Sequence, residues 1–178
     1  AHLRNYQAPA GRYNAFYVLG NKAAFVAEPN MRKQDIKPQI AMALRGPRYN
    51  LYLEQQTEWD DTPLYIFDEW NAYVNGAAVG VDQVQHGLYH DGWTDAVMGP
   101  LEFCVYAIAT AKAVAEGDPT YFASNTQFRA FTAWELRGKL PIDPSHAQLR
   151  HIVAGDVFEG QESKSEVIVI AAAREMVN

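Results

Sequence analysis

The sequence predicts a mainly helical protein of the α+β class, a helical bundle around a buried central helix with a small N-terminal β-hairpin. Hydrophobic residues make up 48% of the 178 residues, which is enough to bury a core without disulfides or a metal. Beyond Pro29, apolar and small residues recur at spacings of three and four, which is typical of helices. Because Pro and Gly are spread along the chain rather than gathered into a linker, we expect one domain over residues 1–178.

The hairpin is expected over residues 13–28. Two segments of high β-propensity, 14–19 and 23–27, flank Gly20 and Asn21. This pair suits a tight turn that needs positive φ. Two strands alone are marginally stable, so we expect the hairpin to pack on the helices.

The helical core is expected over residues 34–155. Its first helix is predicted over 34–44, because Gly46 follows as a stop signal. A second is predicted over 47–58, because Pro47 suits the first position of a helix.

A long helix is predicted to begin where Thr62 supplies an N-cap and Pro63 the first helical position. The apolar spacing continues past Gly76 to about Tyr89. The next predicted helix, residues 95–116, is apolar almost all round and is therefore the expected central helix.

The C-terminal part of the chain contains further helix signals. Asp-Pro pairs are expected to open a helix over 118–138 and a shorter one over 143–155. The terminal segment 165–177 is predicted as either helix or strand, because 167–170 favours strand and 171–175 favours helix.

Composition excludes several classes of protein. The chain has 15 Lys and Arg against 21 Asp and Glu, a net charge of −6, which argues against nucleic acid as a partner. The apolar run at 103–109 is too short to span a membrane. Cys104 is the single cysteine, which excludes an intramolecular disulfide and a Cys-cluster zinc site. The lone cysteine and the low share of charged residues, 20%, slightly favour an exported protein, periplasmic or extracellular.

Glu69 is the leading candidate for a catalytic group. On a helix it shares a face with Ala72, Tyr73, Gly76 and Gly80. The small residues on this face allow another helix to approach closely. A carboxyl group desolvated in this way suits general-acid or general-base work near neutral pH. Asp68 lies one position round the helix and is expected to be more exposed.

The alternative for Glu69 is a structural role. A buried acid is commonly paired with an arginine, here Arg45 or Arg48, or hydrogen-bonded to a backbone group or a tyrosine.

Glu102 is the second candidate acid, near the start of the predicted central helix. The helix dipole favours a carboxylate there, which is sufficient structural reason for it. Alternatively, Glu69 and Glu102 face each other across neighbouring helices and form a glycosidase-like pair or a metal site.

His86 and His90 are one helical turn apart, within reach of a single divalent metal ion, and Asp91 or Asp82 could add an oxygen ligand. Gly87 and Gly92 indicate that the helix ends here, which would break this geometry, so an exposed histidine pair is the alternative. We otherwise expect no cofactor, because no nucleotide-binding glycine motif is present.

Aromatic residues near the acids are candidate substrate-binding groups. Trp59, Trp70 and Tyr73 could stack on sugar rings, with Asn71 adding hydrogen bonds. The alternative is that these rings fill the core with their polar atoms at its rim.

Three hypotheses follow for function. The first is a hydrolase that uses Glu69, with Glu102 or Asp68, on a glycan or other polymeric substrate. The second is a non-catalytic helical binding or interaction domain with a small-molecule, glycan, peptide or protein partner. The third is a metal-binding domain that uses His86 and His90.

Overall fold

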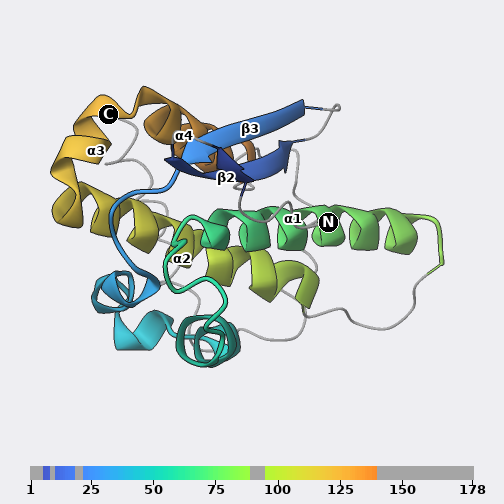
Figure 1. Ribbon diagram of the computed structural model, residues 1–178. Helices are drawn as coiled ribbons and strands as arrows, with labels where there is room; N and C mark the ends of the chain where they lie inside the picture. The colour runs from blue at the N-terminus through green and yellow to red at the C-terminus, as the bar shows by residue number, and fades with distance from the viewer. Residues whose placement is uncertain (1–5, 9–10, 19–21, 89–94, 140–178) are drawn as a thin grey trace.

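The computed structural model describes residues 6–8, 11–18, 22–88 and 95–139, and the account below concerns these residues. The chain is mainly helical, with a small antiparallel sheet near its N-terminus, as predicted. In Figure 1 the sheet lies on one side of α1 and the short helical turns η1–η4 lie on the other. The single domain over residues 1–178 stays a prediction.

The sheet contains the predicted hairpin and one additional strand. Strands β2 (Gly11–Val18) and β3 (Lys22–Ala27) pair antiparallel, from Tyr13 opposite Ala27 to Val18 opposite Lys22. Strand β1 (Tyr6–Ala8) extends the sheet in the order β1-β2-β3. Three residues before a proline carry too little alternation to predict a strand.

The helix predicted over 34–44 is wrong. The structure has three short 3₁₀ turns instead, η1 (Lys33–Asp35), η2 (Lys37–Gln39) and η3 (Met42–Leu44). Pro38 explains the difference, because proline inside a helix removes a hydrogen-bond donor and its ring clashes with the preceding turn.

The helix predicted over 47–58 is replaced by a shorter π-helix, η4 (Tyr49–Gln55). Buried charged side chains hold both of its ends. Glu102 accepts the N–H groups of Arg48 at 2.7 Å and Tyr49 at 3.1 Å, at the N-terminal end. Lys33 Nζ donates to the carbonyl oxygen of Gln56 at the C-terminal end. The helix dipole stabilises an acidic group at the start of a helix and a basic group at its end.

Helix α1 (Tyr65–Gln85) confirms the long helix that the apolar spacing predicts. Thr62 is not its N-cap as predicted, because Leu64 occupies that position without a side-chain cap. Glu28 Oε2 accepts the N–H of Leu64 at 3.2 Å. N–H groups at a helix start need partners outside the helix, so a carboxyl group next to the sheet satisfies one of them.

Helix α1 ends at Gln85 rather than near Tyr89. Gly87 adopts φ +67°, a conformation that glycine reaches without strain. The N–H of Leu88 then bonds to the carbonyl of Gln83 at 2.9 Å, which closes the helix in a Schellman-type turn.

Helix α2 (Asp95–Gly117) confirms the apolar helix predicted over 95–116. The helix predicted over 118–138 is divided into α3 (Pro119–Ser124) and α4 (Thr126–Lys139). Asn125 explains the break, because its side chain accepts the N–H of Phe128 at 2.9 Å and asparagine favours the N-cap. The predicted helix 143–155 and the terminal segment 165–177 lie outside the described residues.

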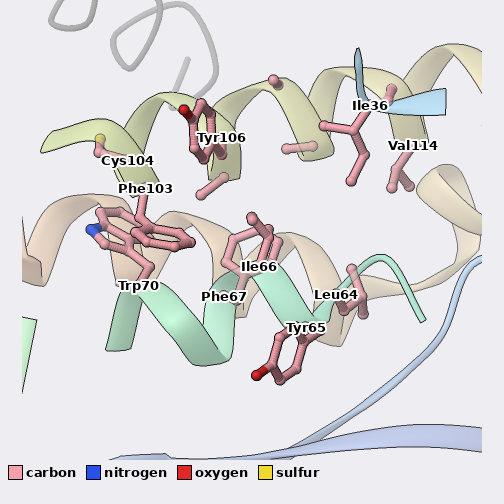
Figure 2. Packing of buried hydrophobic residues seen from close by; sticks show 14 of the residues in the cluster. Ile36, Leu64, Tyr65, Ile66, Phe67, Trp70, Phe103, Cys104, Tyr106 and Val114 are labelled. Atoms are coloured by element: carbon pink, nitrogen blue, oxygen red, sulfur yellow. The ribbon is translucent and has the colours of Figure 1, made fainter. Parts of the chain in front are cut away.

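The core lies mainly between α1 and α2. In Figure 2, Ile66 and Trp70 of α1 and Phe103 of α2 point into the space between these two helices. Phe16 of β2 stacks on Phe131 of α4 with ring centroids 4.5 Å apart, which joins the sheet to the helices. Helix α2 also contacts α3, α4 and η2, an arrangement compatible with the predicted central helix.

Among the described helices, none is both long enough and apolar enough to cross a bilayer.

Candidate active site

The two predicted acids lie on facing helices. Glu69 on α1 is 5% exposed and Glu102 on α2 is 7% exposed. A tyrosine of the same helix hydrogen-bonds to each acid from four residues away, Tyr65 to Glu69 and Tyr106 to Glu102. The burial of these acids follows the sequence prediction, and their chemical roles stay predictions.

Glu102 is surrounded by hydrogen-bond donors. Its Oε1 accepts the Tyr106 hydroxyl at 2.5 Å, in addition to the two backbone N–H groups at the start of η4. Its Oε2 accepts Nη1 of Arg48 at 3.0 Å, which completes a buried salt bridge. Burial and the bond to Glu102 both raise the pKa of Tyr106, which therefore stays a neutral donor.

These contacts favour a structural role for Glu102. A buried ion pair whose oxygens are also hydrogen-bonded is fixed in geometry, and removal of one partner is strongly destabilising. Gly46 lies directly against the carboxyl group, where a Cβ atom would come within 2.5 Å of Glu102 Cδ. The sequence suggested Arg45 or Arg48 as a partner for Glu69, whereas the ion pair of Arg48 is with Glu102. Arg45 instead places its guanidinium over the Tyr49 ring, 4.6 Å from the centroid.

Glu69 is surrounded by tyrosines. The Tyr65 hydroxyl donates to Glu69 Oε1, and in Figure 2 this hydroxyl points away from α2. Tyr52 of η4 approaches from a separate element, and its hydroxyl lies 3.4 Å from that of Tyr73. The pKa of Tyr52 is raised, first by burial, then by its hydrogen bond to Tyr73 and by its interaction with Glu69. We refer to Glu69, Tyr65, Tyr52 and Tyr73 as the acid–tyrosine cluster.

Tyr73 connects this cluster to Glu102. The Arg48 guanidinium that bonds Glu102 also lies over the Tyr73 ring, 5.1 Å from its centroid. Phe103 of α2 stacks on the Tyr73 ring, with the two ring centroids 4.8 Å apart. Gly99 of α2 packs against the same ring, with no room for a Cβ atom. The two acids therefore belong to one connected region.

The other predicted residues on α1 are placed differently. Asp68 is partly exposed, as expected. Trp70 and Asn71 are buried, at 1% and 5% exposure. Trp59 is 2% exposed, with its Nε1 donating to Gln56 at 3.1 Å. The tryptophan rings are covered by other core residues, which favours the packing alternative, and their substrate-binding role stays a prediction.

His86 is exposed just after the end of α1, with its Nδ1 2.8 Å from the carbonyl oxygen of Asp82. His90 and Asp91 lie outside the described residues. Within the part of the chain that the structure describes, no group of three or more His, Cys, Asp or Glu residues could hold a metal ion. The metal site therefore stays an untested prediction.

Cys104 is buried in the core, as expected. Burial raises the pKa of its thiol to about 12, so the thiolate needed for nucleophilic chemistry is scarce at neutral pH.

Glu28 is a partly buried acid that the sequence did not single out. Its carboxyl group contacts the Asn14 side chain and the Leu64 N–H. Burial raises its pKa to about 8, and the hydrogen bond from Leu64 opposes that shift. A charged residue at the end of a short strand is usually solvated, so no sequence signal marked it.

Sequence reasoning also missed the tyrosines that touch the acids. Tyr65 and Tyr106 could have been found, because side chains four apart on a helix are neighbours. Tyr52 could not, because its place depends on the π-helix and on contacts between residues far apart in the chain.

Comparison with protein-family models, with curated proteins and with solved structures finds no match to this chain.

Proposed function

We propose that this chain is a hydrolase in which Glu69 transfers protons, acting on a glycan or another polymeric substrate. Glu102 is assigned to the support of the site rather than to the reaction, because Arg48, Tyr106 and the start of η4 all bind its oxygens.

The observation that carries the proposal is the π-helix η4, Tyr49–Gln55. π-helical segments are rare and are frequent at functional sites. This one supplies Tyr52 to the acid–tyrosine cluster and the Tyr49 N–H to Glu102. A rare element that reaches both predicted acids supports a functional rather than a purely structural region.

The chemistry follows from the properties of a carboxyl group. As a general base, Glu69 would take a proton from the water that attacks the scissile bond and return it to the leaving group. The Tyr65 hydroxyl donates to Oε1 and so orients the carboxyl group for proton transfer. Tyr52 and Tyr73 are partly exposed, so movement of these rings is the proposed route by which substrate reaches Glu69.

The test is the substitution Glu69→Gln, which removes the proton-transfer group and nearly preserves shape. Hydrolysis is measured as release of reducing ends from a panel of polysaccharides and as release of amines from unstructured polypeptides. Loss of general acid–base catalysis lowers rates by about 10² to 10⁴-fold. We expect a loss in that range with an unchanged circular dichroism spectrum.

The matched control is Glu58→Gln, because Glu58 is exposed and lies outside the cluster. It should hydrolyse the substrates at the wild-type rate. A folded Glu69→Gln variant with wild-type turnover would contradict the proposal. So would a wild-type protein that turns over no substrate of either class.

A second candidate function is a non-catalytic interaction domain. The last turns of α1 and Leu88, three residues beyond its end, expose apolar side chains, with Val79 55%, Val84 47% and Leu88 74% exposed. In Figure 1 this end of α1 extends past the sheet. Exposed apolar groups gathered at one end of an element favour contact with another protein surface.

Self-association is the direct test of this second function. Sedimentation velocity at rising protein concentration should show an oligomer that Val79→Ser combined with Leu88→Ser weakens at least tenfold. Met42→Ser is the control, because Met42 is 82% exposed elsewhere on the molecule. If the wild-type chain stays monomeric at every protein concentration, the hypothesis of self-association through α1 is wrong.

A further inference from the structure

Lys33 is a buried lysine whose ammonium group holds the C-terminal end of the π-helix. It belongs to η1 and is 4% exposed. Its Nζ donates to the carbonyl oxygens of Gln56 and, at 3.5 Å, of Tyr52, and it lies 2.9 Å from Asp60 Oδ1. An ammonium group has three N–H donors, so these three acceptors satisfy it and hold it in one place.

The first connection from Lys33 to Glu69 is made by Tyr52. The last carbonyl groups of a helix lack partners within it, and Lys33 supplies one for the carbonyl of Tyr52. The Tyr52 ring packs edge-on against Phe103 of α2, with centroids 4.9 Å apart, and its hydroxyl lies 3.4 Å from that of Tyr73. The interaction of Tyr52 with Glu69 therefore depends on a backbone position that Lys33 fixes.

The second connection is made by Trp59. The ammonium group of Lys33 lies 4.8 Å from the centroid of the Trp59 ring, which is a cation–π contact. This ring packs on that of Tyr65, with centroids 5.5 Å apart, and the Tyr65 hydroxyl donates to Glu69 Oε1. Trp59 and Tyr65 are 2% and 7% exposed, so close packing restricts both rings.

We propose that Lys33 is a positioning residue, which orients the Glu69 carboxyl group by fixing the backbone of Tyr52 and the ring that packs on Tyr65. Two tyrosines interact with Glu69, one from α1 and one from η4, and Lys33 contacts a support of each. The expected effect on catalysis rests on the proposed hydrolase function, whereas the expected effect on the orientation of the carboxyl group does not.

Lys37 provides a matched comparison in the same region. It belongs to the next 3₁₀ turn, η2, and its Nζ lies 2.6 Å from Glu54 Oε2 of η4. The two side chains are 27% and 42% exposed, and a surface ion pair of this kind contributes little to stability. Lys37 therefore contacts a side chain of η4 at the surface, whereas Lys33 binds the backbone of η4 from the core.

The test compares Lys33→Met with Lys37→Met in the full chain. Methionine keeps a flexible apolar side chain and removes the ammonium group. A misplacement of about 1 Å can lower a rate by about 10²-fold, so we expect Lys33→Met to lower kcat by about 10 to 10²-fold. KM should change little, because Lys33 is buried and is not expected to touch substrate. Lys37→Met should keep the wild-type kcat.

A double substitution separates positioning from a general structural effect. If Lys33 acts through Glu69, Lys33→Met should lower the rate no further in a chain that already carries Glu69→Gln. Independent effects add in free energy and therefore multiply in rate. A full multiplication of the two losses would overturn the proposal.

A measurement without substrate keeps the proposal testable even if the wild type turns over no substrate. The carboxyl carbon of Glu69 is observed by carbon-detected NMR and is assigned by its loss from the glutamate signals in Glu69→Gln. Its signal should move in Lys33→Met and stay in place in Lys37→Met. An unmoved signal in a folded Lys33→Met overturns the proposal, whereas a moved signal without hydrolysis supports positioning and contradicts only the hydrolase function.

Lys33→Gln replaces Lys33→Met if the latter does not fold. Its amide keeps two N–H donors for the backbone carbonyl groups, while the charge is removed and the side chain is shorter. We expect the same displacement of the Glu69 signal and the same fall in kcat. A folded Lys33→Gln with both at their wild-type values would show that Lys33 does not position Glu69.

Discussion

Glu102, which is buried, and Glu28, which is partly buried, both place a carboxyl group at a junction between elements, yet their surroundings differ. Glu102, between η4 and α2, accepts a guanidinium N–H, two backbone N–H groups and a tyrosine hydroxyl. Glu28, between β3 and α1, contacts one backbone N–H and one side-chain amide. Arg12 is nearby, but its side chain is 40% exposed and bonds to Asp61.

This difference shows that burial alone does not determine how a carboxyl group serves a fold. Desolvation disfavours the charged form, whereas a cation and several donors favour it. At Glu28 desolvation is the largest influence and raises the pKa to about 8. At Glu102 several donors, with Arg48 among them, bind the carboxyl oxygens and fix the start of the π-helix.

The largest effect is expected from breaking the Glu102 junction with Arg48→Met. The arginine side chain is 10% exposed and that of Glu102 5%, so the remaining carboxylate would be buried without its cation. Breaking a buried pair in this way costs about 3–5 kcal/mol. Guanidinium denaturation at pH 7 should show a loss of that size. A loss below about 1 kcal/mol would mean that the pair is not holding the junction.

The sequence predicted the parts of the fold that local patterns encode. The apolar spacing along α1 and α2 predicted both long helices, and the hairpin was predicted from its strands and its turn. Local patterns failed where one residue interrupts a helix, as Pro38 and Asn125 do. They also failed for η4, whose two ends are held by Glu102 and Lys33 from distant parts of the chain.

The candidate site was predictable to the same extent. The apolar surroundings of Glu69 and Glu102 in the sequence indicated that both acids are buried. Their partners were predictable only within a helix turn, as with Tyr65 and Tyr106. The choice of Arg48 for Glu102 and the place of Tyr52 depend on tertiary contacts that no periodicity reveals.

A smaller effect, at the same junction, is expected from Gly46→Ala. The added Cβ would lie 2.5 Å from Glu102 Cδ and Oε2, so the carboxyl group would have to move. Its oxygens are held by Arg48, Tyr49 and Tyr106, which prevents an easy shift. Overpacking of this kind costs about 1–3 kcal/mol, measurable by denaturation at pH 7.

Gly76→Ala supplies the matched control for that substitution. Gly76 lies within α1, and a Cβ atom there would meet nothing within 4 Å. Alanine in a helix interior is about 0.5–1 kcal/mol more favourable than glycine, so this variant should gain stability while Gly46→Ala loses it. Opposite signs for the same added methyl group would locate the cost at the Glu102 carboxyl. If Gly46→Ala is as stable as Gly76→Ala, the carboxyl group of Glu102 can move. Glu102 would then not be held more firmly than Glu28, and the contrast between the two acids would fail.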